Sequence, residues 1–151
     1  MALAAGDRAP LVALNDQNGE GRRSDQLAGK ALVLFFYPKD DTPGCTAEAC
    51  AFRDSYADLQ SLGAEVWGVS GDDQASHQRF ASRHDLPFPL LVDQGNALRK
   101  AFGVPNVLGL LPGRVTYVID REGVIRHVFN NLLDGAAHRN EARAALQRLP
   151  L

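Results

Sequence analysis

Residues 31–37 read ALVLFFY, an unbroken apolar run that limits what this chain can fold into more than any other feature. A strand with one solvent-facing side alternates apolar and polar residues, and this run shows no alternation. It therefore predicts a central strand over residues 30–37, buried on both faces and ended by Pro38. A strand covered on both sides needs a layer above it and a layer below it, which indicates an α/β fold.

The segments around this strand alternate between strand and helix patterns. Further strands are predicted over residues 65–70, 90–92, 114–120 and 124–129, and helices over residues 45–62, 73–84, 96–102 and 136–149. Residues 11–14 and 21–24 flank a turn sequence and predict an N-terminal β-hairpin. The order β-α-β followed by β-β-α predicts a mixed central sheet with helices on both faces. Residues 104–113, with two prolines and two glycines, are expected to form a surface loop beside the functional site.

The composition is that of one ordinary globular domain over residues 1–151, with 45% hydrophobic and 23% charged residues. A chain of this length can bury a sizeable core without disulfides or metal. Its net charge of −2, with scattered basic residues, argues against nucleic acid or an anionic membrane as partner. The chain has no apolar run of membrane-spanning length, and its N-terminus does not resemble a signal peptide, so we expect a cytoplasmic protein.

Both cysteines of the chain, Cys45 and Cys50, lie in one short segment after the central strand. In a reducing compartment such cysteines are more often catalytic, redox-active or metal-binding than structural. Thr42 suits the N-cap and Pro43 the first position of the predicted helix, which places Cys45 in its first turn. Unpaired N–H groups and the helix dipole favour a thiolate there, so the position predicts a reactive nucleophile.

Cys45 also continues the apolar stripe of its helix, since Ala49 and Phe52 follow at steps of four and three. We therefore expect its sulfur at the bottom of a shielded pocket. The Thr42 hydroxyl is near enough in sequence to donate to the sulfur or to a bound substrate, and Pro38 would wall the pocket. The plainer alternatives are that Thr42 only caps the helix and that Pro38 only ends the strand.

Cys50 lies on a different side of the predicted helix. Five residues turn a helix through about 500°, so the two cysteine side chains point roughly 140° apart. Their Cα atoms would lie roughly 8–9 Å apart, whereas a disulfide rarely spans more than about 7 Å. A bond between them would require residues 44–52 to unwind. The alternative is that Cys50 is an inert, packed thiol.

The pattern PxxxTxxC formed by Pro38, Thr42 and Cys45, and the segment TPGCTAEAC over residues 42–50, resemble peroxiredoxins of the bacterioferritin comigratory protein or Q type. The likeness extends to GVS at residues 68–70, to RVTYVID at residues 114–120 and to the final helix. This resemblance implies a thioredoxin fold and the reduction of hydrogen peroxide and organic hydroperoxides.

The resemblance also implies roles for single residues. Cys45 corresponds to the peroxidatic cysteine, Thr42 to the residue that hydrogen-bonds the sulfur and the peroxide, and Pro38 to the shield of the pocket. Arg114 corresponds to the arginine that activates the cysteine and polarises the peroxide, and Glu48 to a polar residue that orients this arginine. From the residues alone, Arg114 could be a surface arginine and Glu48 a favourable charge in a first helical turn.

A reaction cycle follows from the same resemblance. Cys45 would attack the O–O bond and become a sulfenic acid. Cys50 corresponds to the resolving cysteine of one subgroup, which forms an intramolecular disulfide that thioredoxin or a similar dithiol reduces. No metal or organic cofactor is implied, and the expected state is a monomer or a weak dimer.

Two other functions would use the same thiols. A dithiol–disulfide oxidoreductase normally has a Cys-x-x-Cys spacing, whereas four residues separate Cys45 from Cys50. A redox sensor or holdase would undergo the same oxidation and pass it to a partner without turnover.

The remaining polar residues give weaker signals. The four histidines show no metal-ligand spacing and are expected to be surface or hydrogen-bonded residues: His77, His84, His127 and His138. Asp40 and Asp41 are typical of a turn.

Overall fold

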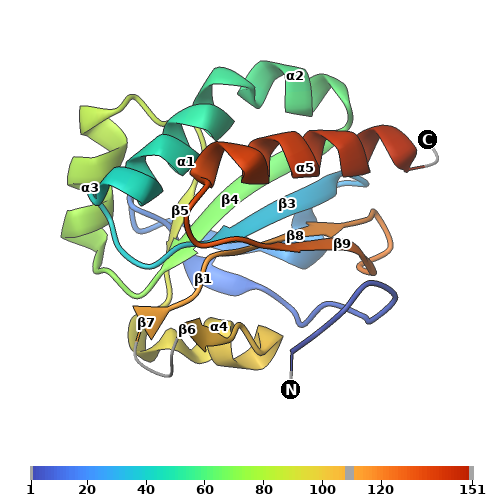
Figure 1. Ribbon diagram of the computed structural model, residues 1–151, viewed down its shortest axis with the longest axis horizontal. Helices are drawn as coiled ribbons and strands as arrows, with labels where there is room; N and C mark the ends of the chain where they lie inside the picture. Colours follow the sequence, from blue (N-terminus) through green and yellow to red (C-terminus); the bar gives the residue numbers. More distant parts are fainter. Residues whose placement is uncertain (1, 108–110, 150–151) are drawn as a thin grey trace.

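A five-stranded mixed sheet forms the centre of the protein in the computed structural model, which describes residues 2–107 and 111–149 (Figure 1). Its strands, in order across the sheet, are β5 Leu90–Val92, β4 Ala64–Ser70, β3 Ala31–Phe36, β8 Val115–Ile119 and β9 Ile125–Asn130. β3 is parallel to β4 and β4 to β5, whereas β8 is antiparallel to both β3 and β9. The predicted mixed sheet is confirmed.

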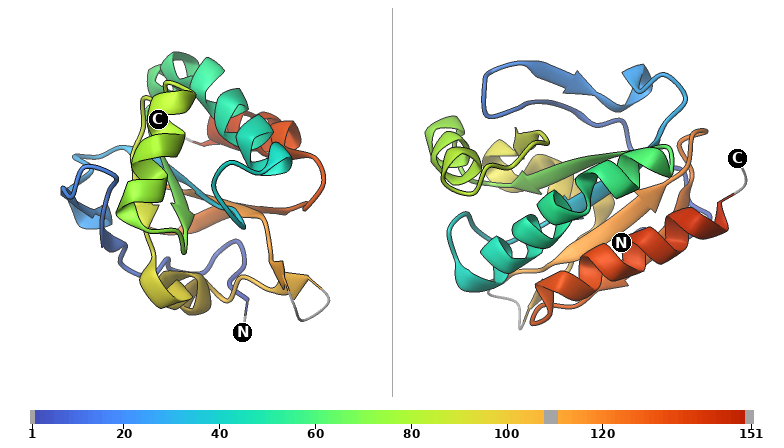
Figure 2. Two further views of the ribbon diagram at one scale, coloured as in Figure 1. Left: turned by 90° about the vertical axis from the view of Figure 1, so that its left-hand side faces the viewer. Right: turned by 90° about the horizontal axis from the view of Figure 1, so that it is seen from above.

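Helices cover both faces of this sheet, as predicted (Figure 1, Figure 2). They are α1 Pro43–Asp54, α2 Tyr56–Ser61, α3 Gln74–Arg83, α4 Ala97–Phe102 and α5 Gly135–Arg148. Every residue of β3 is buried, because successive side chains meet different layers. Phe35 stacks on Phe52 of α1 with ring centroids 4.6 Å apart, whereas Phe36 packs against Phe102 of α4 at 5.3 Å.

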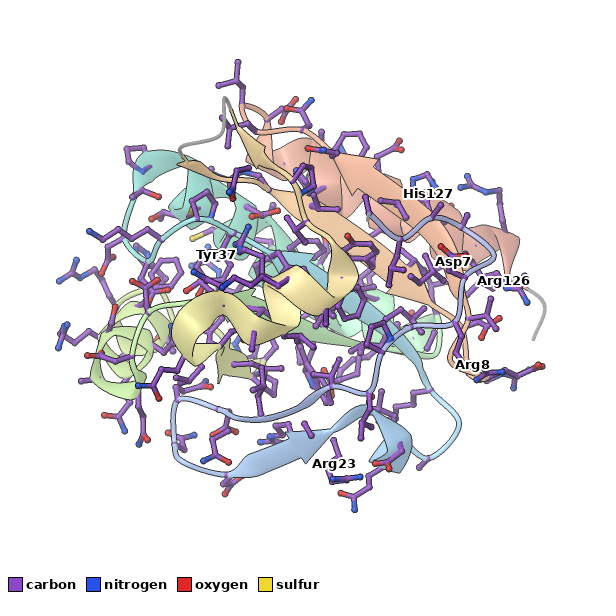
Figure 3. All side chains as sticks on the ribbon, turned by 90° about the horizontal axis from the view of Figure 1, so that it is seen from below. Asp7, Arg8, Arg23, Tyr37, Arg126 and His127 are labelled. Atoms are coloured by element: carbon purple, nitrogen blue, oxygen red, sulfur yellow. The ribbon has the colours of Figure 1, made fainter. Side chains whose placement is uncertain are left out.

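The N-terminal part of the chain adds a small second sheet. β1 Ala13–Asn15 and β2 Gly21–Arg23 form the predicted antiparallel hairpin, and a 3₁₀ helix, η1 Ser24–Gln26, follows. Before the hairpin, Arg8 forms a β-bridge with Val124, and Figure 3 shows Asp7 beside Arg126 of β9. The N-terminal segment is thereby tied to the edge strand of the main sheet.

The single helix predicted over residues 45–62 is wrong, because two helices meet at Ser55 (φ −106°, ψ 5°). Arg139 of α5 donates to the Ser55 hydroxyl at 3.2 Å and to the Ala51 carbonyl at 3.5 Å. The apolar stripe from Phe52 to Leu59 stays in the core across the break. Periodicity alone therefore could not show where α1 ends.

The irregular loop predicted over residues 104–113 is wrong in part. β6 Asn106–Val107 pairs with β7 Leu111–Pro112, and residues 108–110 lie outside the described residues. Strands of two residues are too short to leave a periodic signal in the sequence. A second 3₁₀ helix, η2 Gln94–Asn96, precedes α4. Of the helices that the structure describes, none is both long and apolar enough to cross a membrane.

Candidate active site

The sheet topology brings Arg114 to Cys45, although 69 positions separate them in the sequence. Antiparallel pairing of β3 and β8 sets Phe36 opposite Val115. The residue that begins β8 is therefore close to the residue that ends β3, and the chain leaves β3 toward α1 at this point. Arg114 and the first turn of α1 meet at the carboxyl end of β3.

Cys45 is the third residue of α1, and its side chain lies inside the protein with 1% of the residue exposed. Pro43 occupies the first helical position, and Thr42 before it is extended (φ −90°, ψ 152°), as expected for an N-cap residue. The sulfur of Cys45 thus lies at the positive end of the helix, where N–H groups without helical partners stabilise a negative charge.

Arg114 uses all three nitrogens of its buried guanidinium. Nη2 donates to the sulfur of Cys45 at 3.3 Å, Nη1 to Oε1 of Glu48 at 2.6 Å, and Nε to the Leu132 carbonyl at 3.0 Å. Burial opposes the charge, but the interactions with Glu48 and Cys45, both in hydrogen-bond contact with the guanidinium, outweigh it and raise the pKa of Arg114. Arg114 is therefore a permanent, fully oriented cation beside the thiol.

Glycine at residue 44 leaves room for this arrangement. A Cβ atom there would lie 3.0 Å from Nη2 of Arg114, closer than nearly all real Cβ contacts. A larger residue would press on the guanidinium and disturb its contact with Cys45. Gly44 thus fits the close approach of helix and arginine.

Glu48 is completely buried one turn after Cys45, and its pairing with Arg114 matches the contact that the resemblance implied. Burial raises the pKa of Glu48 to about 8, and the charge of Arg114 acts in the opposite direction. The second carboxyl oxygen, Oε2, has no hydrogen-bond donor among the described residues. The alternative that Glu48 is a favourable charge in a first helical turn is wrong, because Glu48 is buried and lies beyond the first turn of α1.

Thr42 and Pro38 are both half-buried. The Thr42 hydroxyl donates to the Lys39 carbonyl at 3.0 Å; it does not hydrogen-bond the Cys45 sulfur, and it accepts no N–H group of the helix N-terminus. β3 ends at Phe36, one residue before the predicted end, and Pro38 follows after Tyr37. Their roles toward a substrate stay predictions.

Cys50 is half-buried, and both cysteines are free thiols. α1 is continuous from Pro43 to Asp54, so it spans both residues. The helical geometry that keeps the two thiols out of bonding distance is thus present. The structure shows the helix intact with both thiols free, as expected for the reduced form.

Sequence reasoning missed Arg99 of α4, which is 4% exposed. Its Nη2 donates to the Tyr37 carbonyl and its Nη1 to the Gly113 carbonyl, both at 2.7 Å. These carbonyls belong to the residues just before Pro38 and Arg114, so Arg99 joins the two halves of the site. An isolated arginine in a short helix carries no sequence signal for such a role.

Asp40 does lie in a turn, but its carboxylate is buried, which the sequence did not reveal. It accepts hydrogen bonds from the hydroxyls of Tyr37 (2.6 Å) and Ser76 (2.8 Å), and His77 Nδ1 lies 2.7 Å away. This network anchors the loop between β3 and α1. His77, expected to be a surface or hydrogen-bonded residue, is the latter.

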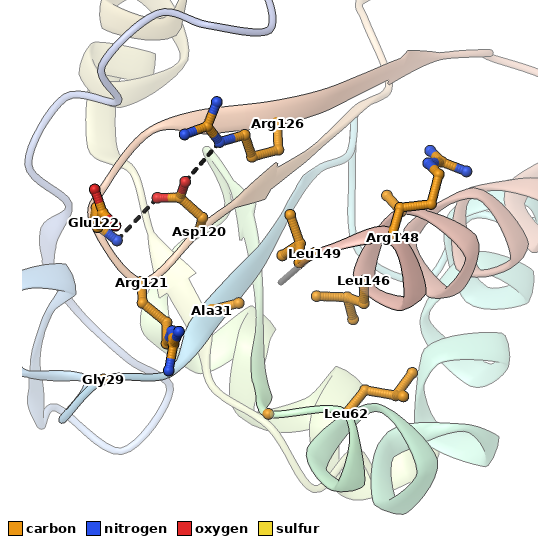
Figure 4. A pocket seen from close by; sticks show the side chains of 12 residues that line it. Gly29, Ala31, Leu62, Asp120, Arg121, Glu122, Arg126, Leu146, Arg148 and Leu149 are labelled. Carbon is orange, nitrogen blue, oxygen red and sulfur yellow. Dashed lines mark hydrogen bonds and ion pairs between the residues drawn. The ribbon is translucent and has the colours of Figure 1, made fainter. Parts of the chain in front are cut away.

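A hollow of about 570 Å³ lies at the other end of β3, where Ala31 contributes to its wall (Figure 4). Its charged lining includes Arg121, Arg148 and Arg126, of which the last pairs with Asp120 at 2.6 Å. Neither Cys45 nor Cys50 lines it. The candidate site around Cys45 is therefore separate from this hollow.

Comparison with known proteins agrees with the geometry. The family model described as AhpC/TSA family matches residues 5–128. The chloroplastic peroxiredoxin Q of Triticum aestivum is 49% identical over 148 residues, which cover 97% of this chain and 68% of that relative.

Two solved structures superpose closely on this chain. Peroxidoxin BcpB from Mycobacterium tuberculosis matches with a TM-score of 0.90 and 35% identity over 99% of each chain. The bacterioferritin comigratory protein of Xanthomonas campestris matches with a TM-score of 0.83 and 31% identity, over 93% of this chain and 98% of that one. The thioredoxin fold and the resemblance predicted from the sequence are confirmed.

Proposed function

Because the chain belongs to the AhpC/TSA family and is a peroxide-reducing thiol enzyme of the peroxiredoxin Q type, we propose that Cys45 is the thiol that attacks the peroxide. The observation that carries this assignment is the 3.3 Å contact between Nη2 of Arg114 and the Cys45 sulfur. A buried sulfur at a helix N-terminus beside an oriented cation is stabilised as the thiolate, which is the nucleophilic form. Cys50 has no comparable partner among the described contacts.

The first step is a displacement on the O–O bond. The Cys45 thiolate forms an S–O bond with one peroxide oxygen, and the O–O bond breaks. The other oxygen leaves with the electron pair and takes up a proton to become water or an alcohol. Arg114 and N–H groups of the first turn of α1 stabilise the charge that moves onto the leaving oxygen. Cys45 is oxidised to a sulfenic acid and the peroxide is reduced.

We assign hydrogen peroxide and organic hydroperoxides as substrates. Alkyl peroxide reduction is the activity attributed to the bacterioferritin comigratory protein of Xanthomonas campestris, one of the relatives that superpose on this chain. Both substrate classes present the same O–O bond to the thiolate and differ only in the group on the distal oxygen. A comparison of rates with hydrogen peroxide and with an alkyl hydroperoxide tests the order of preference.

The second step is resolution by Cys50. Its thiolate attacks the sulfur of the sulfenic acid, the hydroxyl leaves as water after taking up a proton, and a disulfide forms. Because α1 holds the two Cα atoms roughly 8–9 Å apart, its first turns must unwind. A Cβ on Gly135 would lie 2.8 Å from the Gly44 carbonyl oxygen and from the Glu48 nitrogen, so α5 packs tightly on the turn that opens.

The last step is reduction by thioredoxin or a similar dithiol. One thiolate of the reductant attacks the disulfide, a mixed disulfide forms, and the second thiol of the reductant releases the protein. Two electrons pass to the peroxidase, which regains both thiols. We place this cycle in the cytoplasm, where such dithiols are kept reduced.

Rapid-mixing kinetics with hydrogen peroxide test the first step. Oxidation of the wild-type protein should be far faster than oxidation of free cysteine, and Cys45→Ser should lose the fast phase. If Cys45→Ser keeps the fast phase, the assignment of Cys45 is wrong. A single oxidation without turnover in the presence of thioredoxin and its reductase would favour a sensor.

Cys50→Ser tests the second step. It should keep the fast oxidation, lose thioredoxin-linked turnover and accumulate sulfinic acid, detected by mass spectrometry. Amide exchange of the oxidised wild-type protein should show loss of protection over residues 44–52, and Cys50→Ser should not. Normal turnover of Cys50→Ser would rule out its resolving role.

A further inference from the structure

Glu48 and His138 face each other inside the protein, behind Arg114. Both side chains are fully buried, and Oε2 of Glu48 lies 3.4 Å from Nδ1 of His138. Oε2 has no hydrogen-bond donor among the described residues, although Oε1 receives Nη1 of Arg114 at 2.6 Å. A buried carboxyl oxygen without a donor is costly if the group is charged.

The surroundings of His138 identify which of its nitrogens carries a proton. Nε2 lies 2.7 Å from the Asn131 carbonyl, which has only lone pairs, so Nε2 carries the proton and donates. Burial lowers the pKa of His138 to about 4, so the ring is neutral near pH 7. Nδ1 then presents a lone pair, which accepts the Thr116 hydroxyl at 2.7 Å and also faces Glu48.

If Glu48 were ionised, its negatively charged Oε2 would face the lone pair of Nδ1 with no proton between the two atoms. A protonated Glu48 instead places a neutral oxygen opposite the lone pair and leaves no buried negative charge without a donor. The charged groups that act on the pair are Arg114, just before β8, and Asp134 at the start of α5, and Cys45 in turn acts on Arg114. None of them donates a hydrogen bond to Oε2.

We propose that His138 is a positioning residue that holds Glu48 in its neutral, protonated form and thereby leaves the positive charge of Arg114 to the Cys45 thiolate. An ionised Glu48 would share that cation with the thiolate, and two anions would compete for one guanidinium. The proposal rests on Cys45 being the reacting thiol. It adds a residue of α5 that acts on the sulfur through Glu48 and Arg114.

A pair of substitutions at residue 138 separates the lone pair from the rest of the ring. In His138→Gln the amide nitrogen can still donate to the Asn131 carbonyl, but the acceptor at Nδ1 is lost. In His138→Asn the amide oxygen can replace that acceptor. The alkylation rate of Cys45 by iodoacetamide, measured in the Cys50→Ser background below pH 7, should fall about three- to tenfold in His138→Gln and less in His138→Asn.

A double-substitution cycle tests whether the effect passes through Glu48. Glu48→Gln is a neutral analogue of the protonated acid, so the loss caused by His138→Gln should disappear in the Glu48→Gln background. An equal loss in both backgrounds, or no loss in either, would overturn the proposal. Either result would leave the peroxidase assignment unaffected, because Cys45→Ser tests that assignment separately.

Infrared spectroscopy gives a readout that does not need a His138 variant to fold. The wild-type protein near pH 7 should show the C=O stretch of a buried protonated carboxyl, and Glu48→Gln should lack it. A wild-type spectrum without this band at pH 6–7 would show Glu48 to be ionised and would refute the proposal.

Discussion

Two buried histidine–carboxylate pairs flank the segment that carries Cys45, and they differ in charge. On one side, His77 Nδ1 lies 2.7 Å from Oδ2 of Asp40, and on the other, His138 Nδ1 lies 3.4 Å from Oε2 of Glu48. Burial lowers the pKa of both histidines, but the hydrogen bond and charge of Asp40 outweigh it and raise the pKa of His77. The surroundings therefore favour the charged form of His77 in the first pair and the neutral forms of both groups in the second.

The difference comes from the donors that surround each carboxyl group. Asp40 accepts hydrogen bonds from two hydroxyls in addition to His77, so its negative charge is well stabilised. Glu48 has a described donor on only one of its oxygens. Burial of a histidine beside a carboxyl group can therefore favour either charge state, according to how many donors reach the carboxylate.

A third pair shows what exposure does to the same chemistry. His127 Nε2 lies 3.0 Å from Oε1 of Glu141, but both side chains reach solvent. Water can solvate both groups there, so breaking the pair should change the free energy of unfolding only slightly.

Asp40→Asn should have the largest effect, because it removes the buried carboxylate that contacts Tyr37, Ser76 and His77 in the core. We expect a loss of about 3–5 kcal/mol in the free energy of unfolding, measured with urea. The pKa of His77 is raised in the folded protein. The stability that its pairing provides is therefore complete below the pKa of the unfolded chain and is lost as pH rises through the pKa of the folded protein. The cost should therefore be greatest below neutral pH.

Asp41→Asn is the matched control. Asp41 is the next residue, pairs with Arg83 at 3.2 Å and is partly exposed, and asparagine tolerates its positive φ of 60°. A loss below about 1 kcal/mol is expected. If both substitutions cost the same, Asp40 and His77 do not form a buried ion pair.

Glu48→Gln should change how stability depends on pH. The pKa of Glu48 is raised from 4.5 to about 8, so the folded protein keeps a proton that the unfolded chain releases. In the wild type, the contribution of Glu48 to the free energy of unfolding is complete below pH 4.5 and is lost as pH rises through about 8. Relative to the wild type, Glu48→Gln should gain about 1–3 kcal/mol between pH 5 and pH 8. Parallel unfolding curves across that range would show Glu48 to be ionised throughout.

Thr116→Val should cost about 1 kcal/mol, because it removes the hydroxyl that bonds Nδ1 of His138 at 2.7 Å and keeps the shape of the side chain. Thr116→Ser keeps the hydroxyl and serves as the control. The ¹⁵N chemical shifts of the His138 ring, measured by NMR, should change in the valine variant only. An unchanged His138 signal in Thr116→Val would mean that the hydroxyl does not donate to Nδ1.

His127→Gln should have the smallest effect, within about 0.5 kcal/mol and weaker still in high salt. Urea unfolding at low and high ionic strength measures it. A cost comparable with that of Asp40→Asn would show that burial does not explain the contrast among the three pairs.

Much of the fold could be predicted because it follows from local pattern. The strand over residues 31–37, the order of strands and helices, and the hairpin all leave periodic or turn signals in the sequence. The break at Ser55 and the pairing of β6 with β7 did not, since the first depends on Arg139 of α5 and the second involves strands of two residues.

The sequence by itself determined that Cys45 occupies the first turn of a helix on its buried side and that Cys50 cannot reach it while that helix is intact. The resemblance, and not periodicity, pointed to Arg114 and Glu48. Only the tertiary structure decided that His138 faces Glu48 and that Arg99 joins the two halves of the site. The physical reason is that periodicity records which side of an element is buried, whereas these contacts join polar groups from different elements whose charge states depend on the donors the fold places around them.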